Sequence, residues 1–228
     1  MKKTKRFLEM FNVTVIFTRH DELGNCNSRE LLKIIESKQP DVIFEEIGYV
    51  VYDQVYVQQN RMKLESEAVK AFFMTNNLEH IPVDTFDCPD DYYRGRNHLG
   101  DVLQKYFNKS ERLKLAINQL IDYAHVGGFS FLNSDQNDIL LDTIEREESH
   151  ILAEIADDKL NHLAQLEKEF NSKRDEVMID NIYKYGEEQA FQTAIFLIGA
   201  GHRRSIKRKL DKIEPRNGVE IKWHFLAE

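Results

Sequence analysis

Short β-branched apolar runs alternate with helical stretches through the first 87 residues of the chain. Residues 13–17 form the first run, residues 42–44 the second and residues 81–84 the third. Helices are expected between them, over residues 29–37 and 58–75. Strands that alternate with helices through short connections are typical of a parallel sheet built from right-handed crossovers. The pattern therefore predicts three strands of an α/β sheet.

The alternation stops after the third strand and resumes near the end of the chain. Between residues 97 and 188 apolar positions recur at helical spacing, with a slip in register at residues 157–159. Residues 194–198 and 219–226 then predict two more strands, with a helix over residues 203–212 between them. The last run alternates apolar with charged or polar residues, which favours a half-exposed edge strand.

These elements predict one composite α/β domain with a mostly parallel sheet and flanking helices. Residues 1–96 would form the first part of the core and residues 174–228 the second part. Residues 97–173 would form a helical hairpin or small bundle inserted between them. An insertion at this place would stand as a wall or lid over the strand ends.

Charge and cysteine content narrow the classes of function. The 31 basic and 39 acidic residues give a formal net charge of −8, which argues against a nucleic-acid partner. The basic run between Arg203 and Lys212 is interpreted as a solvated helix face. Cys26 and Cys88 are too few for a disulfide framework. No apolar run approaches the ~18 residues of a membrane span and no signal-peptide pattern follows Met1, so a cytoplasmic location without a membrane partner is expected.

Candidate chemistry gathers at the predicted strand ends. In an open parallel sheet, ligands bind beyond the carboxyl ends of the strands. His20 follows the first strand, Glu45 and Glu46 end the second, Asp84 ends the third, and residues 199–202, with sequence Gly-Ala-Gly-His, follow the fourth. Adjacent strand residues point to opposite faces, so only one of the two glutamates is expected to face inward.

Two kinds of chemistry suit these side chains. Imidazole and carboxylate together can hold zinc, manganese or cobalt. The same groups can act as an acid–base pair in which the carboxylate orients a histidine. Each residue alone is explained as well by a solvated loop, and the convergence of His20, Glu46 and His202 is what favours a site. Gly199 and Gly201 would bring backbone N–H groups close to a ligand.

A helical arginine adds a further candidate. Arg174, Met178 and Asn181 share one helix face by their spacing of four and seven residues. Arg174 could present its guanidinium to an oxyanion or a carboxylate. The alternative is an ion pair on the helix surface.

Taken together, the blocks resemble the superfamily of erythromycin esterase, ChaN, TraB and TIKI proteins. That superfamily shares a Gly-x-x-His-type motif, a glutamate after the second strand, an arginine-bearing helix and a second Gly-x-x-His, in this order. Here Phe17 stands where the first motif has glycine. The matching segments are residues 13–20, residues 38–46, Arg174-Asp175 with Met178 and Ile182, and residues 199–202.

The resemblance implies a hydrolase of amide or ester bonds, acting on a peptide or a small ester or amide. TIKI proteins are metal-dependent proteases, which implies manganese, cobalt or zinc held by His20, Glu46 and His202. Erythromycin esterases use histidine and glutamate without an evident metal, which implies His20 or His202 as the base and Arg174 on the oxyanion. Glu46 is preferred to Glu45 because it lies five residues after Asp41, where the family's carboxylate usually falls.

A function without catalysis is the alternative to a hydrolase. ChaN binds haem, so the same histidines could serve a haem- or metal-binding or protein-interaction module, although haem is the less favoured cofactor. In that case the helical insertion would be a partner surface. Assembly into a homo-oligomer and a monomeric state are both compatible with the sequence.

Overall fold

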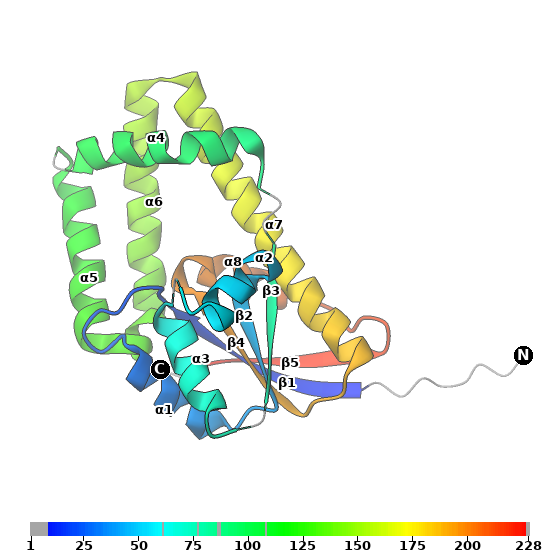
Figure 1. Ribbon diagram of the computed structural model, residues 1–228. Coiled ribbons are helices and arrows are strands. Elements are labelled where there is room, and N and C mark those ends of the chain that lie inside the picture. The colour runs from blue at the N-terminus through cyan, green and yellow to red at the C-terminus, as the bar shows by residue number, and fades with distance from the viewer. Residues whose placement is uncertain (1–8, 61, 77, 86–87, 108, 227–228) are drawn as a thin grey trace, which may run out of the picture.

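The protein is an α/β fold around a five-stranded parallel sheet (Figure 1). The computed structural model describes residues 9–60, 62–76, 78–85, 88–107 and 109–226. The strand order is β3-β2-β4-β1-β5 and every neighbouring pair is parallel, which confirms the predicted fold class. The strands are β1 (Glu9–Thr18), β2 (Val42–Gly48), β3 (Glu79–Asp84), β4 (Thr193–Gly199) and β5 (Val219–Phe225).

The flanking helices follow the sequence pattern with one exception. Helices α1 (Ser28–Lys38) and α8 (Arg203–Leu210) lie where they were expected. The helix expected over residues 58–75 starts later than expected, and it is preceded by α2 (Tyr49–Tyr52) and a π-helical turn (Asp53–Val57), which the pattern did not predict. Gln59 then has a φ of +55°, which interrupts the helical path. Helix α3 (Leu64–Phe73) begins only after this turn.

Four long helices are inserted between β3 and β4; in Figure 1 the first three rise above the sheet and the last runs down alongside it. The break expected near residues 157–159 is present, because Ala156 takes a φ of +50° and Asp157 caps the next helix. The inserted helices extend beyond both expected boundaries between the insertion and the α/β core, which were placed after residues 96 and 173. They are α4 (Asp90–Phe107), α5 (Glu111–Leu132), α6 (Asp135–Ile155) and α7 (Asp158–Glu188).

Helix α5 continues past its two glycines, Gly127 and Gly128. Gly128 has a φ of +58° and a ψ of −141°, so it kinks the helix, which continues to Leu132. A Cβ atom at this position would lie 3.0 Å from the carbonyl oxygen of Asn25. Glycine is therefore required here both for backbone conformation and for close packing against the loop after β1.

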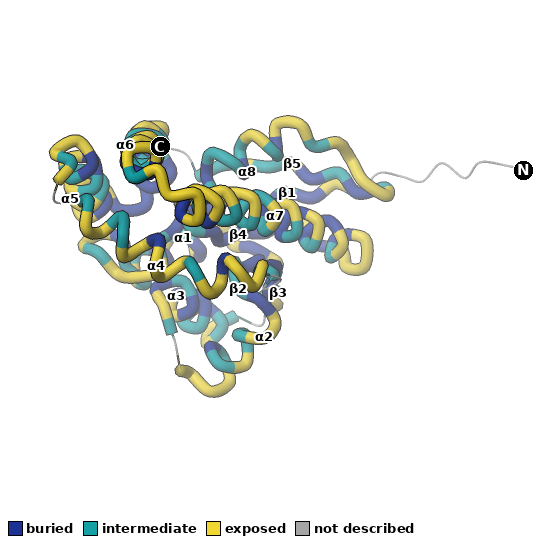
Figure 2. Tube along the Cα trace, turned by 90° about the horizontal axis from the view of Figure 1, so that it is seen from above, coloured by how far each residue is buried: buried dark blue, intermediate teal, exposed yellow. Residues whose placement is uncertain are grey.

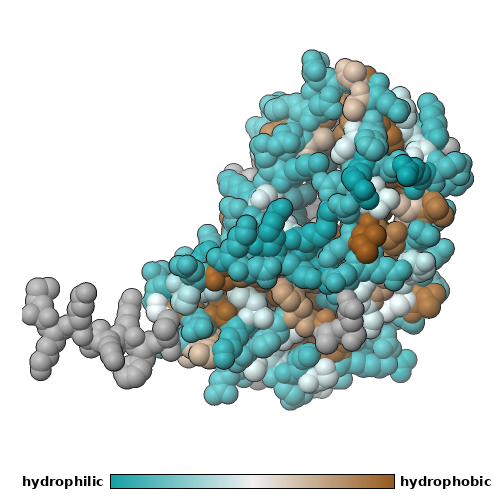
Figure 3. Space-filling view, turned by 180° about the vertical axis from the view of Figure 1, so that it is seen from behind, coloured by the Kyte–Doolittle hydropathy of each residue, from teal (hydrophilic) through white to brown (hydrophobic). Residues whose placement is uncertain are grey.

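Apolar side chains form two separate clusters. The main core surrounds the sheet, whose strands carry mostly buried residues in Figure 2. A smaller cluster joins the inserted helices and consists of Leu99, Leu152, Leu160 and Leu163. The face seen in Figure 3 is largely hydrophilic, with apolar side chains in small separate patches. Within the described ranges, no helix combines the length and the apolar character needed to cross a bilayer.

Candidate functional site

The candidate site lies where α7 crosses the carboxyl ends of the central strands (Figure 1). Glu46 lies near the end of β2, and His202 lies in the 3₁₀ turn (Ala200–His202) directly after β4. Arg174 lies within α7. The structure therefore brings three of the four predicted catalytic residues into direct contact. The fourth, His20, lies two residues beyond β1.

Glu46 is the centre of the cluster and its side chain is only 7% exposed. Its Oε1 atom accepts hydrogen bonds from Arg174 Nη2 at 2.6 Å and from His202 Nε2 at 3.2 Å. Its Oε2 atom accepts one from the backbone N–H of Gly199 at 2.6 Å. Burial alone would raise the pKa of Glu46, but His202, Arg174 and the Gly199 N–H lower that pKa to about 2. The carboxylate is therefore ionised at all physiological pH values.

His202 lies between two carboxylates. Its Nδ1 atom donates to Asp175 Oδ1 at 2.5 Å, and its Nε2 atom donates to Glu46. Burial lowers the pKa of His202, but the hydrogen bonds and charges of Asp175 and Glu46 outweigh it and raise the pKa to about 9. At neutral pH this side chain is an imidazolium that donates from both ring nitrogens.

Arg174 links the ends of two strands. Its Nε atom donates to Asp84 Oδ1 at 3.1 Å, and its Nη2 atom donates to Asp84 Oδ2 and to Glu46 Oε1, both at 2.6 Å. Its Nη1 atom donates to Asn171 at 3.3 Å. Arg174 therefore does not form the ion pair on the helix surface that was the alternative. It forms part-buried ion pairs with two carboxylates at strand ends, Asp84 and Glu46.

Asp84 and Asp175 belong to the cluster, although the sequence assigned neither of them a catalytic or metal-binding role. Asp84 ends β3, so the strand-end rule that selected Glu46 also points to it. Asp175 is 1% exposed and follows Arg174 directly. Neighbouring residues of a helix point about 100° apart, so the helix face shared by Arg174, Met178 and Asn181 does not include Asp175.

His20 forms a separate group at the same edge of the sheet. Its Nδ1 atom lies 3.2 Å from Glu65 Oε1, and the hydroxyl of Thr18 donates to that same oxygen at 2.7 Å. The His20 side chain is 51% exposed. The hydrogen bond with Glu65 raises the pKa of His20, with burial opposing and the charges of Glu65 and Glu46 adding to the rise. Glu65, on α3, is a third site residue that sequence reasoning missed.

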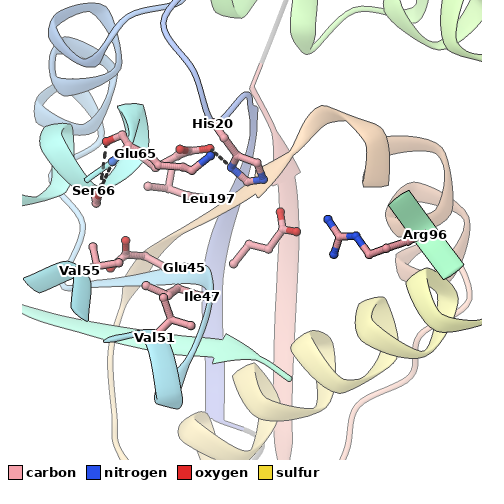
Figure 4. Close-up of a pocket in the computed structure, with 11 residues that line it drawn as sticks. His20, Glu45, Ile47, Val51, Val55, Glu65, Ser66, Arg96 and Leu197 are labelled. Carbon is pink, nitrogen blue, oxygen red and sulfur yellow. Dashed lines mark hydrogen bonds and ion pairs between the residues drawn. The ribbon is translucent and has the colours of Figure 1, made fainter. Parts of the chain in front are cut away.

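Two adjoining cavities connect the His20 group with the Glu46 cluster. Their volumes are about 490 Å³ and 550 Å³, and His20, Glu46 and Arg96 line both. The smaller cavity is drawn in Figure 4. Its other lining residues include the apolar side chains of Ile47, Val51, Val55 and Leu197 and the polar side chains of Glu45, Lys63, Glu65 and Ser66.

Glu45 and Glu46 have different partners. Tyr56 donates its hydroxyl to Glu45 Oε2, and His80 Nδ1 lies 2.8 Å from Glu45 Oε1. Glu46, the glutamate preferred from the sequence, is the one that meets Arg174 and His202. Both glutamates nevertheless line the smaller cavity. The register of β2 against β3 shifts between Glu45 and Gly48, so the strict alternation of faces does not hold at this strand end.

Two of the three predicted metal ligands, Glu46 and His202, already have partners within the protein. Within the described residues no group of three or more histidine, cysteine, aspartate or glutamate side chains is arranged to hold one. Both nitrogens of His202 donate to carboxylates, whereas a metal needs a neutral imidazole with a free lone pair. Glu46 already neutralises the guanidinium of Arg174. A metal held by His20, Glu46 and His202 stays a prediction, and His202 would have to lose a proton before it could bind that metal.

The two candidate glycines differ in what they do. The N–H of Gly199 donates to Glu46, and a Cβ atom on Gly199 would lie 3.2 Å from Glu46 Oε2. Gly199 therefore holds the carboxylate in place. Gly201 is exposed and has open space around it. Both glycines line the larger cavity.

Comparisons with protein-family models, with curated proteins and with solved structures find no match to this chain. The resemblance carried by the four sequence blocks therefore remains an expectation.

Proposed function

We propose that this protein hydrolyses amide or ester bonds in the cavities that His20 and Glu46 line together. The observation that carries the proposal is the chain of contacts from Thr18 through Glu65 to His20, which ends at the same cavity as the Glu46 cluster. A histidine oriented by a carboxylate, next to a second carboxylate held by cations, supports hydrolytic chemistry.

His20 is the proposed general base. Glu65 accepts the hydrogen of Nδ1, which favours the tautomer whose lone pair is on Nε2. Among the described residues, Nε2 has no hydrogen-bond partner of its own. In the proposed reaction His20 takes a proton from water as that water attacks the carbonyl carbon. The proton then passes to the leaving nitrogen or oxygen as the bond to carbon breaks.

Glu46 and Arg174 have separate proposed roles. Glu46 accepts three hydrogen bonds from the protein, so about one of its four lone-pair positions is left to hold the attacking water. Arg174 makes one hydrogen bond through Nη1, to Asn171, and its second Nη1 hydrogen can donate to the developing oxyanion. His202, fixed by Asp175, holds Glu46 in place as a positioning residue.

The test is turnover of a panel of aminoacyl esters and short peptides by the purified protein. His20→Asn should lower kcat by roughly 100-fold or more while the unfolding midpoint stays unchanged. His162→Asn on the exposed face of α7 is the matched control and should retain full activity. Undiminished activity of His20→Asn would contradict the proposal.

Elemental analysis and chelation test the metal-dependent form of the same chemistry. Under the proposal, activity persists after treatment with a chelator. Near-stoichiometric manganese, cobalt or zinc, with activity lost on chelation and restored by that ion, would replace the metal-free route by the metal-dependent one. If the protein hydrolyses none of the substrates but titrates with haem, the non-catalytic binding module is the better account.

A further inference from the structure

The smaller cavity has an apolar side and a cationic side. Ile47, Val51, Val55 and Leu197 supply aliphatic surface, while Arg96 lines the same cavity. A volume of about 490 Å³ exceeds that of one aliphatic side chain and falls in the usual range of small-molecule sites. The occupant is therefore expected to carry an apolar group together with a group that pairs with a guanidinium.

Arg96 differs from Arg174, Arg203 and Arg204, whose guanidinium groups are all paired with carboxylates. Arg174 and Arg204 each bind two carboxylates, and Arg203 pairs with Asp138. Within the described part of the chain, Arg96 makes no hydrogen bond and no ion pair. Figure 4 shows it reaching from α4 into the cavity, from the side opposite Glu65 and Ser66. Its charge is therefore available to a ligand.

The position of Arg96 is fixed by the packing of α4 on α7. The neighbouring Gly95 lies so close to α7 that a Cβ atom there would meet Leu163 Cδ2 at 2.4 Å. One turn earlier, the hydroxyl of Tyr92 donates to Glu167 at 2.9 Å, and the Tyr92 ring contacts Phe170. These contacts hold the backbone of α4 beside the cavity, so the guanidinium is presented from a fixed helix.

We infer that the substrate carries a free carboxylate beside an apolar group, and that Arg96 binds this carboxylate while the aliphatic side chains hold the apolar group. The inference rests on the proposed hydrolase function and specifies its substrate class, an N-acyl amino acid or a peptide with its C-terminus in the cavity. The planar fork of arginine matches a carboxylate. A doubly charged phosphate is disfavoured, because the cavity is also lined by Glu45, Glu46 and Glu65.

The experiment compares the binding of two ligands that differ only in charge. N-acetyl-leucine carries the carboxylate and N-acetyl-leucinamide does not, and calorimetry at low ionic strength gives the affinity of each. The wild-type protein should bind the carboxylate roughly 10-fold more tightly. Arg96→Gln should abolish this preference. Arg94→Gln is the matched control, because Arg94 lies on the same helix, is exposed and pairs with Asp90 at 3.6 Å.

Three results would overturn the inference: equal affinity of the wild type for both ligands, equal effects of Arg96→Gln and Arg94→Gln, or competition by inorganic phosphate as strong as by N-acetyl-leucine. Binding requires no turnover, so the carboxylate preference is measured separately from hydrolysis. If the protein hydrolyses no substrate but still prefers the carboxylate ligand, only the proposed function fails. If it hydrolyses substrates but shows no preference for the carboxylate ligand, only this inference fails.

Discussion

His202 owes its charge to the two carboxylates that face its ring nitrogens. A folded-state pKa of about 9 lies above the ordinary value of 6.5. Protonation of His202 therefore contributes stability that is fully present below pH 6.5 and is lost as the pH rises through 9. We expect the difference in unfolding free energy between the wild type and His202→Asn to shrink by about 3 kcal/mol between pH 6 and pH 9.5.

Denaturant unfolding at several pH values measures this difference directly. His162→Asn, with an exposed imidazole, is the control and should show a difference near zero throughout. A gap between the wild type and His202→Asn that stays constant over this range would mean that His202 is not an imidazolium in the folded protein.

Glu65 acts through His20 and is predicted to be a positioning residue. Its hydrogen bond raises the pKa of His20, so Glu65→Gln should move the rising limb of the pH profile of kcat/KM to lower pH. We also expect kcat to fall by roughly 10-fold with KM nearly unchanged, because the favoured tautomer is lost. Glu65→Asp should restore part of the activity. An unshifted pH profile in Glu65→Gln would show that Glu65 supports only the fold.

The site residues that could be predicted from the sequence lie either at the end of a predicted strand or within a motif. His20, Glu46 and His202 each follow a predicted strand, and Arg174 lies in one of the sequence blocks on which the expected resemblance rests. Glu65 gave no such signal, because it lies in the first turn of a helix whose start was predicted six residues too early. Its contact with His20 joins residues 45 positions apart and depends on the start of α3 meeting the loop after β1, where the N–H of Leu64 donates to the carbonyl of His20 at 3.1 Å.

At the scale of elements, Arg203 joins α8 to the start of α6. The basic run that contains it was expected to be solvated, and this is wrong for Arg203, which is 3% exposed. Its guanidinium donates to Asp138 and, at 2.6 Å, to the carbonyl of Asn133, and it lies over the ring of Phe17. Asn133 in turn binds the backbone of Phe17 in β1 through both side-chain polar atoms.

Because this ion pair is part-buried, removing one partner leaves a charge unpaired. Arg203→Met is expected to lower the unfolding free energy by about 3–5 kcal/mol, whereas the exposed Arg208→Met should stay within about 0.5 kcal/mol of the wild type. The double variant Arg203→Met with Asp138→Leu should recover most of the loss. Denaturant titration measures all three. A double variant no more stable than the single one would show that Asp138 is not the residue left uncompensated.

At the scale of the whole molecule, strand order decides which segments meet. The sequence predicts a parallel sheet but does not state that β4 lies between β1 and β2. That placement puts the end of the fourth strand beside the ends of the first two. The long α7 then returns across the same edge and delivers Arg174 and Asp175. Contacts such as Arg174 with Asp84, 90 residues apart, arise from this arrangement and not from any local pattern.

The two apolar clusters predict two levels of local stability. The outer cluster contains four buried leucines, whereas the main core extends over the whole sheet. Leu160→Ala removes apolar contacts only from the outer cluster, so it should favour openings that leave the sheet intact. We expect faster amide hydrogen exchange in α4 and in the parts of α6 and α7 near Leu160, with exchange in β1 and β4 unchanged.

Leu31→Ala is the matched control for this prediction, because Leu31 is fully buried in the main core. It should accelerate exchange in the sheet and in the inserted helices together, since the slowest amides exchange through global unfolding. If Leu160→Ala also accelerated exchange in β1 and β4, the two clusters would unfold as one cooperative unit. A local opening at Leu160 would instead loosen α4, the helix that carries Arg96, so the same variant should weaken binding of N-acetyl-leucine while leaving the sheet as stable as before.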